Sequence, residues 1–252
     1  MVLPSSTSSA LTFDKTNSKF TFHYFEFHGL GTCARALLCF GEAQWENKLQ
    51  SMEDWPQIKD TTAFGTLPVL IETNTVTGET FEIPDSGAIE RYLAKKFGLL
   101  GDTPREQTLN DIFYAQAVML NTKWAERIVW AFEEVRSKAV EQFLQTTVPN
   151  WAKACEKHLK ESGNTGHFVD NKLTLADIKT AVVMDVLMSM GADHVLNATV
   201  SPCLLKLKET VDTHATYAAW RKSDEFGQLD VFTQTGLSVL MPFDVKKART
   251  FS

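Results

Sequence analysis

The sequence lacks three features that would narrow its function at once: a long apolar run, closely spaced cysteines and an excess of positive charge. No apolar stretch approaches the roughly 18 residues that cross a bilayer as a helix, so we do not expect a membrane-spanning protein. The opening segment MVLPSSTSSALTFDKTNSK has neither the basic nor the apolar region of a secretory signal, and we expect none there. The sequence also shows no internal repeat.

Cysteine spacing and charge each argue against a class of site. Cys33, Cys39, Cys155 and Cys203 form no C-x-x-C pair, so zinc sites and thioredoxin-type redox motifs are unsupported and no metal is expected. The spacing of the cysteines fits best with reduced thiols in a cytoplasmic protein. The formal net charge of −6 argues against nucleic acid as a partner, because phosphate binding needs clustered cations.

The chain does contain enough apolar residues for a proper core: 44% of its 252 residues, sufficient for one large domain or two ordinary ones. In the first hundred residues, FTFHYF, VLIET and GETFEI have strand character, and NTVTG lies between the last two as a hairpin turn. CARALLCFGEA and SGAIERYLAKKFGL have helical spacing. The order strand, helix, middle segment, strand, strand, helix predicts a small α/β domain with one mixed sheet.

After about residue 102 the pattern is helical throughout, which predicts a second, all-helical domain. One long helical segment, free of Gly and Pro, is expected over residues 109–145. Further helices are expected at 148–162, 172–191, 203–214 and 217–226. The expected division is a flexible N-terminal extension at 1–18, an α/β domain at 19–100, the helical domain at 105–232 and a C-terminal tail at 233–252.

One helix start is well specified by the segment LTLADI. Thr174 can cap the helix and Asp177 can serve as the reciprocal N3 residue, which makes an acidic variant of the capping box. Leu173 and Ile178 occupy the positions of a hydrophobic staple. We interpret this motif as folding chemistry without a catalytic role.

Tyr24, Trp55 and Lys59 are candidates for binding a charged ligand. Tyr24 ends the first predicted strand, and its hydroxyl could donate a hydrogen bond to a thiolate and favour the ionised form. Trp55 and Lys59 are four residues apart, so on a helical turn they share a face and suit a carboxylate. Taken singly, a core tyrosine and an exposed turn with a half-buried tryptophan are the ordinary structural interpretations.

Two further features lie around prolines of the same domain. If the Leu67–Pro68 bond is cis, Leu67 presents its N–H and C=O outward to a peptide-like ligand; a trans proline at a strand start is the commoner case. Asp85 and Ser86 open a predicted helix, where free N–H groups attract a carboxylate and Asp85 could pair with an ammonium group. A simple N-cap would explain the same two residues.

Taken together and in this order, the stretches YFEFHGLGTCAR, EDWPQIKD, FGTLPVL, PDSGAIERYLAKKFGL and LTLADI resemble cytosolic glutathione transferases, most closely the sigma-like branch with a catalytic tyrosine. The resemblance covers most of residues 20–222. It implies a fold of α/β plus all-α type, with a thioredoxin-like N-terminal domain followed by an all-helical C-terminal domain. It also implies glutathione as co-substrate or cofactor, a cytoplasmic homodimer, and a role in detoxification or secondary metabolism.

The resemblance assigns roles to particular residues. Tyr24 would stabilise the glutathione thiolate, Trp55 and Lys59 would hold the glycyl carboxylate, and Asp85 and Ser86 would bind the γ-glutamyl end. The Leu67–Pro68 bond would be cis, and Leu67 would pair with the cysteinyl backbone of glutathione, with Thr66 and Pro68 beside it in the binding site. An apolar second substrate would lie against Phe27, Leu30, Tyr114, Val118, Met119 and Trp124.

Three positions depart from the family pattern. Leu30 stands where the family often has an arginine, and Asp85 where sigma-like members commonly have glutamine. Val118 lies near the position expected for an acidic residue that reaches glutathione from the partner subunit. A competing mechanism would use Cys33 at a helix N-terminus as a thiolate that forms mixed disulfides.

Three functions therefore stay open at this point. The first is a glutathione transferase that uses Tyr24 to activate the thiol for attack on an apolar electrophile. The second is an isomerase or biosynthetic enzyme that uses glutathione and returns it. The third is a non-catalytic module of the same fold.

Overall fold

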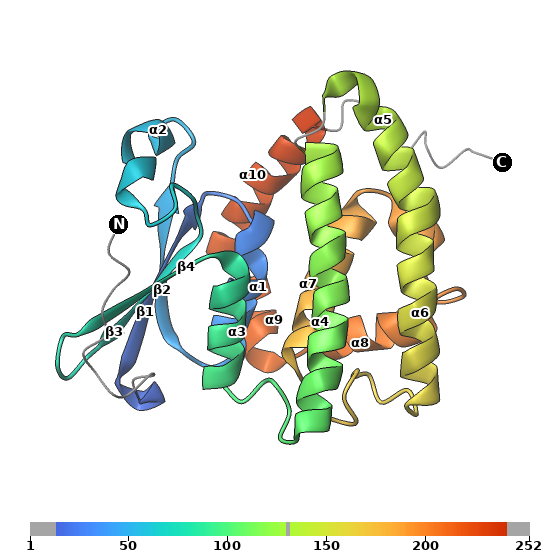
Figure 1. Ribbon diagram of the computed structural model, residues 1–252, viewed down its shortest axis with the longest axis horizontal. Coiled ribbons are helices and arrows are strands. Elements are labelled where there is room, and N and C mark those ends of the chain that lie inside the picture. Colours follow the sequence, from blue (N-terminus) through green and yellow to red (C-terminus); the bar gives the residue numbers. More distant parts are fainter. Residues whose placement is uncertain (1–13, 130–131, 241–252) are drawn as a thin grey trace. The chain divides into compact units, whose positions relative to one another are not determined.

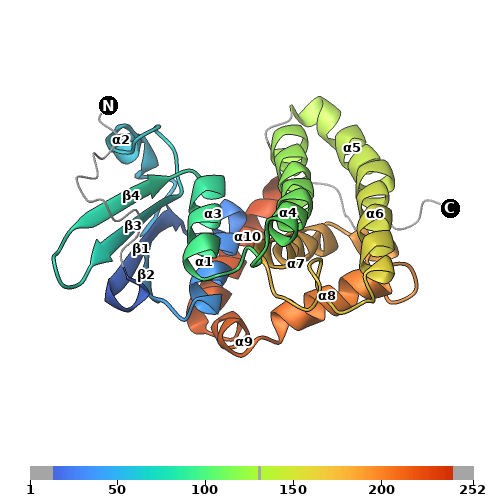
Figure 2. The same ribbon diagram turned by 60° about the horizontal axis from the view of Figure 1, so that its bottom comes forward.

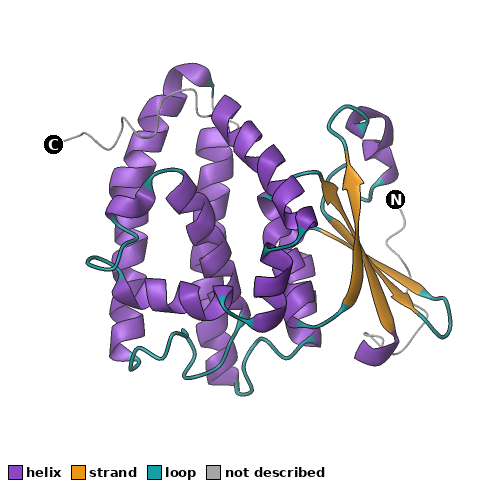
Figure 3. Cartoon of the chain, turned by 180° about the vertical axis from the view of Figure 1, so that it is seen from behind, coloured by secondary structure: helices purple, strands orange, loops and turns teal. Residues whose placement is uncertain are grey.

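The computed structural model describes residues 14–129 and 132–240, which form two compact units (Figure 1). The first unit contains the described residues up to Leu99 together with Ala215–Gln234. The second contains Leu100–His214 and the described residues beyond Gln234. All strands of the described chain belong to the first unit (Figure 3).

A four-stranded mixed sheet forms the centre of the first unit. Its order is β2 (Gln44–Gln50), β1 (Ser18–Phe25), β3 (Val69–Asn74) and β4 (Thr80–Pro84). β1 is parallel to β2 and antiparallel to β3, and β4 is antiparallel to β3. The two central strands bury apolar side chains such as Phe20, Phe22 and Leu70, which is the burial that β-branched and aromatic strands require.

Helices α1 (Thr32–Phe40) and α3 (Ser86–Lys96) pack against each other on one face of this sheet (Figure 1). The short helix α2 (Trp55–Ile58) follows β2. Although it follows the helical unit in sequence, α9 (Ala215–Arg221) packs on α1 within the first unit.

The second unit is helical. It comprises α4 (Pro104–Trp124), a π-helical turn (Ala125–Val129), α5 (Glu133–Gln142), a second π-helical turn (Phe143–Thr147), α6 (Val148–Glu161), α7 (Leu175–Ser189) and α8 (Pro202–Asp212). α7 packs against α4 and α8, and α6 packs against α8 and α4 (Figure 2). α7 is buried over most of its length, so it forms the core of this unit. No described helix has the length and apolarity that crossing a membrane would require.

The expected fold class is confirmed, since a mixed sheet in an α/β unit precedes a set of helices. Three details of the expectation are wrong. The middle segment contains the edge strand β2, whose alternately exposed polar residues gave no apolar signal. The single long helix expected over 109–145 is divided into α4 and α5, and the helix expected over 217–226 is divided between α9 and α10 (Asp224–Leu240).

The limits of the units also differ from those expected. Residues 215–234 group with the sheet rather than with the helices, because α9 packs on α1. The first strand already begins at Ser18, inside the expected N-terminal extension, and α10 continues to Leu240, inside the expected tail. The rest of the extension and of the tail, residues 1–13 and 241–252, lies outside the described residues.

Candidate active site

Tyr24 lies near the C-terminal end of β1 with its side chain only 4% exposed. Its hydroxyl oxygen accepts a hydrogen bond from the backbone N–H of Leu30, at 3.1 Å. Its ring packs edge-on against Phe25 and Phe27, with centroids 5.4 and 5.6 Å away. A tyrosine hydroxyl can accept and donate at once, so this arrangement is compatible with donation of its own proton to a ligand.

The turn after β1 approaches Tyr24 so closely that two of its residues must be glycine. A Cβ on Gly29 would lie 2.9 Å from the Tyr24 hydroxyl oxygen, and φ is +40° at this residue. A Cβ on Gly31 would lie 2.7 Å from the Tyr24 ring. Both distances are too short for a real side chain, so the glycines allow the backbone N–H of Leu30 to reach the hydroxyl.

Trp55 and Lys59 are brought to one short helical segment, as their spacing predicts. Trp55 begins α2, and its half-buried ring packs edge-on against Phe25 at 5.3 Å. Lys59 follows α2 directly, is exposed, and has no carboxylate partner within the part of the chain that the structure describes. An indole fixed on an aromatic cluster beside an exposed ammonium group suits a carboxylate ligand.

The Leu67–Pro68 peptide bond is cis, as the sequence analysis expects. Leu67 and Pro68 are both buried and precede β3, whose strand pairing begins at Val69. The adjacent Thr66 is exposed. The segment thus brings the backbone of Leu67 to the start of a central strand without including it in the ladder.

Asp85 is the N-cap of α3, and Ser86 is the first residue of this helix. One carboxylate oxygen of Asp85 accepts the N–H of Ala88 at 2.9 Å. The backbone of Asp85 has a φ of +77°, which is unusual outside glycine. The first-turn N–H groups of an eleven-residue helix favour an anion at this end.

The residues assigned to the second-substrate pocket are divided between the two units. Phe27 and Leu30 follow β1, and Phe27 stacks on Phe25 with centroids 5.5 Å apart. The other four lie on α4: Tyr114 is buried, whereas Val118, Met119 and Trp124 are partly exposed. A pocket common to all six residues stays a prediction.

Three polar residues that the sequence did not single out form a chain of hydrogen bonds that begins beside Tyr24. Arg35 of α1 is completely buried, and its guanidinium carbon lies 5.7 Å from the centre of the Tyr24 ring. Its Nε donates to the side-chain oxygen of Asn47, at 2.9 Å, and Asn47 in turn donates to Glu225 of α10, at 2.8 Å. The signal was a single charged residue inside the apolar helix segment CARALLCF.

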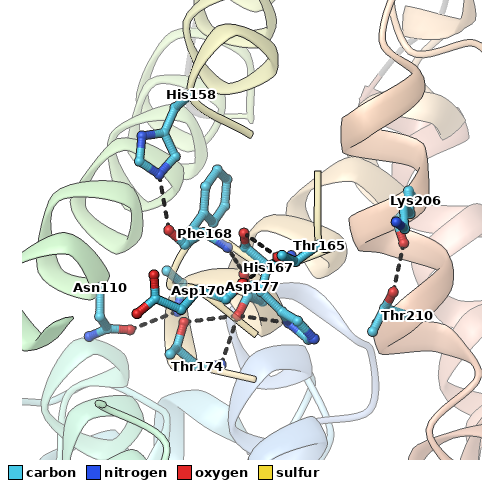
Figure 4. Close-up of polar contacts among 11 residues, drawn as sticks. Asn110, His158, Thr165, His167, Phe168, Asp170, Thr174, Asp177, Lys206 and Thr210 are labelled. Carbon is cyan, nitrogen blue, oxygen red and sulfur yellow. Dashed lines mark hydrogen bonds and ion pairs between the residues drawn. The ribbon is translucent and has the colours of Figure 1, made fainter. Parts of the chain in front are cut away.

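The capping box predicted at LTLADI is confirmed (Figure 4). The N–H and the hydroxyl of Thr174 both donate to one carboxylate oxygen of Asp177, at 2.7 and 2.9 Å. The other oxygen accepts the N–H of Phe168 at 2.8 Å, and Asn110 of α4 accepts the N–H of Ala176 at 3.0 Å. These contacts fix the start of α7 against its neighbours, which supports the interpretation as folding chemistry.

All four cysteines are free and buried. Burial raises the pKa of Cys39 and of Cys155 to about 12, so both thiols are protonated at neutral pH. Cys33 lies inside the first turn of α1 with 1% exposure, a position that argues against mixed-disulfide chemistry. Among the described residues, no group of three metal-ligating side chains lies close enough together to hold an ion.

Comparison with known proteins agrees with this geometry. Residues 120–224 match the family model described as "Glutathione S-transferase, C-terminal domain". The chain is 32% identical to the hematopoietic prostaglandin D synthase of Gallus gallus over 199 residues, 78% of this chain and 92% of that one. It is 33% identical to glutathione S-transferase 1 of Ascaris suum over 66% of this chain and 77% of that one.

Among solved structures, the prostaglandin synthase D of Nilaparvata lugens matches with a TM-score of 0.70 and 27% identity, over 82% of this chain and 98% of that one. The chain therefore belongs to the cytosolic glutathione transferase superfamily of enzymes.

Proposed function

We propose that the first unit binds glutathione and that Tyr24 activates the glutathione thiol for attack on an apolar electrophile. The observation that carries this proposal is the hydroxyl of Tyr24, held by the N–H of Leu30 at 3.1 Å on an otherwise buried side chain. The sulfur lone pair forms a bond to the electrophilic carbon, and the leaving group departs with the electron pair of the broken bond.

The role of Tyr24 follows from the acidity of thiols. A free thiol has a pKa of about 8.5 and is mostly protonated at neutral pH, whereas the thiolate is the nucleophile. A hydroxyl that donates a hydrogen bond to the sulfur favours the ionised form and so lowers the thiol pKa. Burial of the Tyr24 ring strengthens this bond, since water competes less well in a low-dielectric site.

The remaining residues fit the rest of a zwitterionic tripeptide. Lys59 and Trp55 suit the glycyl carboxylate, because one is an exposed cation and the other a fixed N–H donor. The Thr66–Leu67–Pro68 segment would pair with the cysteinyl backbone as an added strand. The start of α3, at Asp85 and Ser86, offers N–H groups to the γ-glutamyl carboxylate and a carboxylate to the ammonium group.

The second substrate would be apolar. Phe25 and Phe27 are stacked next to Tyr24 and offer aromatic surface beside the hydroxyl. We propose that Leu30 extends this surface and that helix α4 contributes the rest of the pocket through Tyr114, Val118, Met119 and Trp124.

Replacing the hydroxyl tests this function directly. We expect Tyr24→Phe to lower kcat/KM for conjugation of an aromatic electrophile by about a hundredfold, the typical loss for one donor to a developing or stabilised anion. Tyr217→Phe makes the same chemical change in another buried tyrosine of the first unit and serves as the control. Full conjugating activity of Tyr24→Phe would defeat the proposed mechanism.

A second candidate is a reaction that uses glutathione and returns it. It is favoured by the relatives named as prostaglandin D synthases, because the same thiolate could serve isomerisation. Mass analysis of the products separates the two functions: a conjugate retains the mass of the tripeptide, and an isomer does not.

We also propose that the enzyme acts as a cytoplasmic homodimer in detoxification or secondary metabolism. All four cysteines are buried and none forms a disulfide bond, which supports a reducing compartment. The exposed apolar side chains of Met52 and Phe64, in the first unit, support association with a second copy.

A further inference from the structure

Arg35 is a buried cation that lies over the rings of Phe22 and Tyr24 and forms no ion pair with a carboxylate of the described residues. It is 0% exposed in the apolar helix α1. Its hydrogen bonds within the described chain go to neutral oxygens: the side chain of Asn47 at 2.9 Å, the carbonyl of Phe27 at 3.0 Å and the carbonyl of Phe25 at 3.4 Å. A buried charge without an adjacent counter-ion is costly, so its position calls for a reason.

The guanidinium lies close to the faces of two aromatic rings. Its central carbon is 5.2 Å from the centroid of Phe22 and 5.7 Å from that of Tyr24. A Cβ on Gly31 would lie 3.0 Å from Nη1 of Arg35 and 2.7 Å from the Tyr24 ring. Cation, ring and backbone turn therefore meet at this glycine, where a side chain would not fit.

A positive charge at this distance favours the anionic state of whatever lies at the Tyr24 hydroxyl. Burial lowers the pKa of Arg35, but a guanidinium stays charged at neutral pH, and the coupling to Tyr24 opposes this lowering. Leu30, whose N–H holds the hydroxyl, has an uncharged side chain. Arg35 is thus the cation that the described structure places at Tyr24.

Glu225 of α10 modulates the positive potential of Arg35 without direct contact. Asn47 lies between the two, accepting from Arg35 and donating to Oε1 of Glu225 at 2.8 Å. The other carboxylate oxygen accepts the indole N–H of Trp220 at 3.4 Å. The carboxylate offsets part of the positive potential of Arg35 without touching it.

Other titratable groups near this strand face elsewhere. His23 precedes Tyr24 on β1, so its side chain points to the opposite face of the sheet, where Lys48 of β2 is its register partner. His28, on the turn, packs against Trp220 and Phe226. The remaining titratable groups of α1 in the described structure are the buried thiols of Cys33 and Cys39. Burial raises the pKa of Cys39, and the charge of Glu225 adds to this rise, so Cys39 is protonated at neutral pH.

We propose that Arg35 is a positioning residue that raises the acidity of Tyr24 and of a thiol bound to it, and that Glu225, through Asn47, limits this effect. The part that concerns the thiol rests on the proposed function. The part that concerns the phenol of Tyr24 does not, because it can be measured without glutathione.

The test is the titration of the Tyr24 phenol in the ligand-free full-length protein, followed by ultraviolet absorbance of tyrosinate. The protein has four tyrosines, so the spectrum of Tyr24→Phe is subtracted to isolate this one. We expect Arg35→Met to raise the apparent pKa of Tyr24 by about one unit, since an opposite charge at such distances typically shifts a pKa by one unit or more. Arg35→Lys should give a smaller rise.

Glu225→Gln provides a second variant with an effect of opposite sign. The glutamine keeps an oxygen acceptor for Asn47, removes the negative charge and gives up only the long 3.4 Å bond from Trp220, so we expect the pKa of Tyr24 to fall by a few tenths of a unit. A purely structural role of either residue predicts no such pair of opposite shifts. If Arg35→Met does not fold, Glu225→Gln decides: an unchanged or raised pKa overturns the proposal.

The same variants are then titrated with bound glutathione, by the ultraviolet absorbance of the thiolate. We expect the thiol pKa to follow the phenol pKa in direction, and kcat of Arg35→Met to fall about tenfold at neutral pH and to recover at higher pH. Suppose that Arg35→Met raises and Glu225→Gln lowers the phenol pKa, while Tyr24→Phe keeps full conjugating activity. That result would refute the proposed function but support the role of Arg35. An unchanged pKa of the Tyr24 phenol in folded Arg35→Met would refute the role of Arg35 and leave the proposed function untouched.

Discussion

Lys96 and Glu72 form an ion pair that is almost completely buried, with side-chain exposures of 3% and 0% and a distance of 2.7 Å between Nζ and Oε1. The pair joins α3 to the central strand β3. The hydroxyls of Ser18 and Tyr92 also donate to the Glu72 carboxylate. Burial and this carboxylate together raise the pKa of Tyr92, which therefore stays a donor at all physiological pH values.

We predict that Lys96→Met lowers the free energy of unfolding by about 3–5 kcal/mol, because it leaves a buried carboxylate without its cation. Adding Glu72→Gln removes that charge and keeps an oxygen acceptor for one of the two hydroxyls, while its amide N–H can donate to the other, so the double variant should be more stable than Lys96→Met alone. Urea unfolding of the two single variants and the double variant measures this coupling. Additive losses would show that the pair does not act as a unit.

Asp85 stands where sigma-like members commonly have glutamine. The role of its charge can be tested separately from its role as the N-cap of α3. Asparagine tolerates the positive φ and keeps the acceptor for the Ala88 N–H, so Asp85→Asn removes only the charge. If Asp85 pairs with the glutathione ammonium, KM for glutathione should rise roughly fivefold, about 1 kcal/mol for an exposed ion pair.

A glutathione analogue without the amino group is the matched control for this prediction. Wild type and Asp85→Asn should bind it equally well, because the ammonium partner is absent from the ligand in both cases. A variant that loses the same affinity for both ligands would assign Asp85 to the cap alone.

At the scale of elements, α4 begins with a capping box that its sequence contains as T-P-R-E. Thr103 accepts the N–H of Glu106 at 3.2 Å, and the Glu106 carboxylate accepts the N–H of Thr103 at 3.2 Å and of Asp102 at 2.6 Å. The other carboxylate oxygen accepts from Lys172 at 2.8 Å. The bond from Lys172, followed by the backbone bond from Asp102, lowers the pKa of Glu106 to about 2.

We predict a loss of stability on acidification that depends on Glu106. Because its pKa is lower in the folded chain than the value of about 4.3 expected in the unfolded chain, its contribution is fully present above pH 4.3 and is lost as the pH falls toward 2. Glu106→Gln should therefore flatten the fall of the urea midpoint between pH 5 and pH 3, measured at constant ionic strength. Glu209→Gln, at an exposed glutamate of α8, should keep the wild-type slope.

The elements that the sequence predicted well carry strong local signals. The strands around FTFHYF and VLIET, and the capped start of α7, have apolar periodicity or capping residues at fixed offsets. The edge strand β2 has no such signal, because QWENKLQ exposes most of its residues and is fixed by pairing with β1. The division into α4 and α5 was also missed, since a segment without Gly and Pro gives no local reason to break.

At the scale of the whole molecule, the candidate site was easier to propose than its supports. Tyr24, Trp55, Lys59 and the cis bond at Leu67 could be singled out because they lie in stretches that resemble the glutathione transferase family in the same order along the chain; the cis bond is confirmed, and the roles of the residues stay predictions. Arg35 could not, because its contacts join segments far apart in sequence: α1, β2 and α10. Likewise, the grouping of residues 215–234 with the sheet is a tertiary contact without a sequence signature.

The proposed homodimer gives a prediction for the complete chain. The mass of one chain is 28.3 kDa, and sedimentation analysis of a dimer should give an apparent mass of twice that value. Phe64 is 57% exposed, unusually high for a phenylalanine, and follows α2 in the first unit. If this side chain is covered by a second copy, Phe64→Glu must bury a charge without a partner, and we expect the dimer dissociation constant to rise at least tenfold.

Val76→Glu is the matched control, because Val76 is 73% exposed at the hairpin between β3 and β4 and receives the same charge. Sedimentation velocity over a range of protein concentrations separates the outcomes. Dissociation in Phe64→Glu but not in Val76→Glu would assign the interface to the surface around Phe64. Equal behaviour of both variants and wild type would show that this exposed aromatic side chain takes no part in association, and a wild-type mass of one chain would contradict the dimer itself.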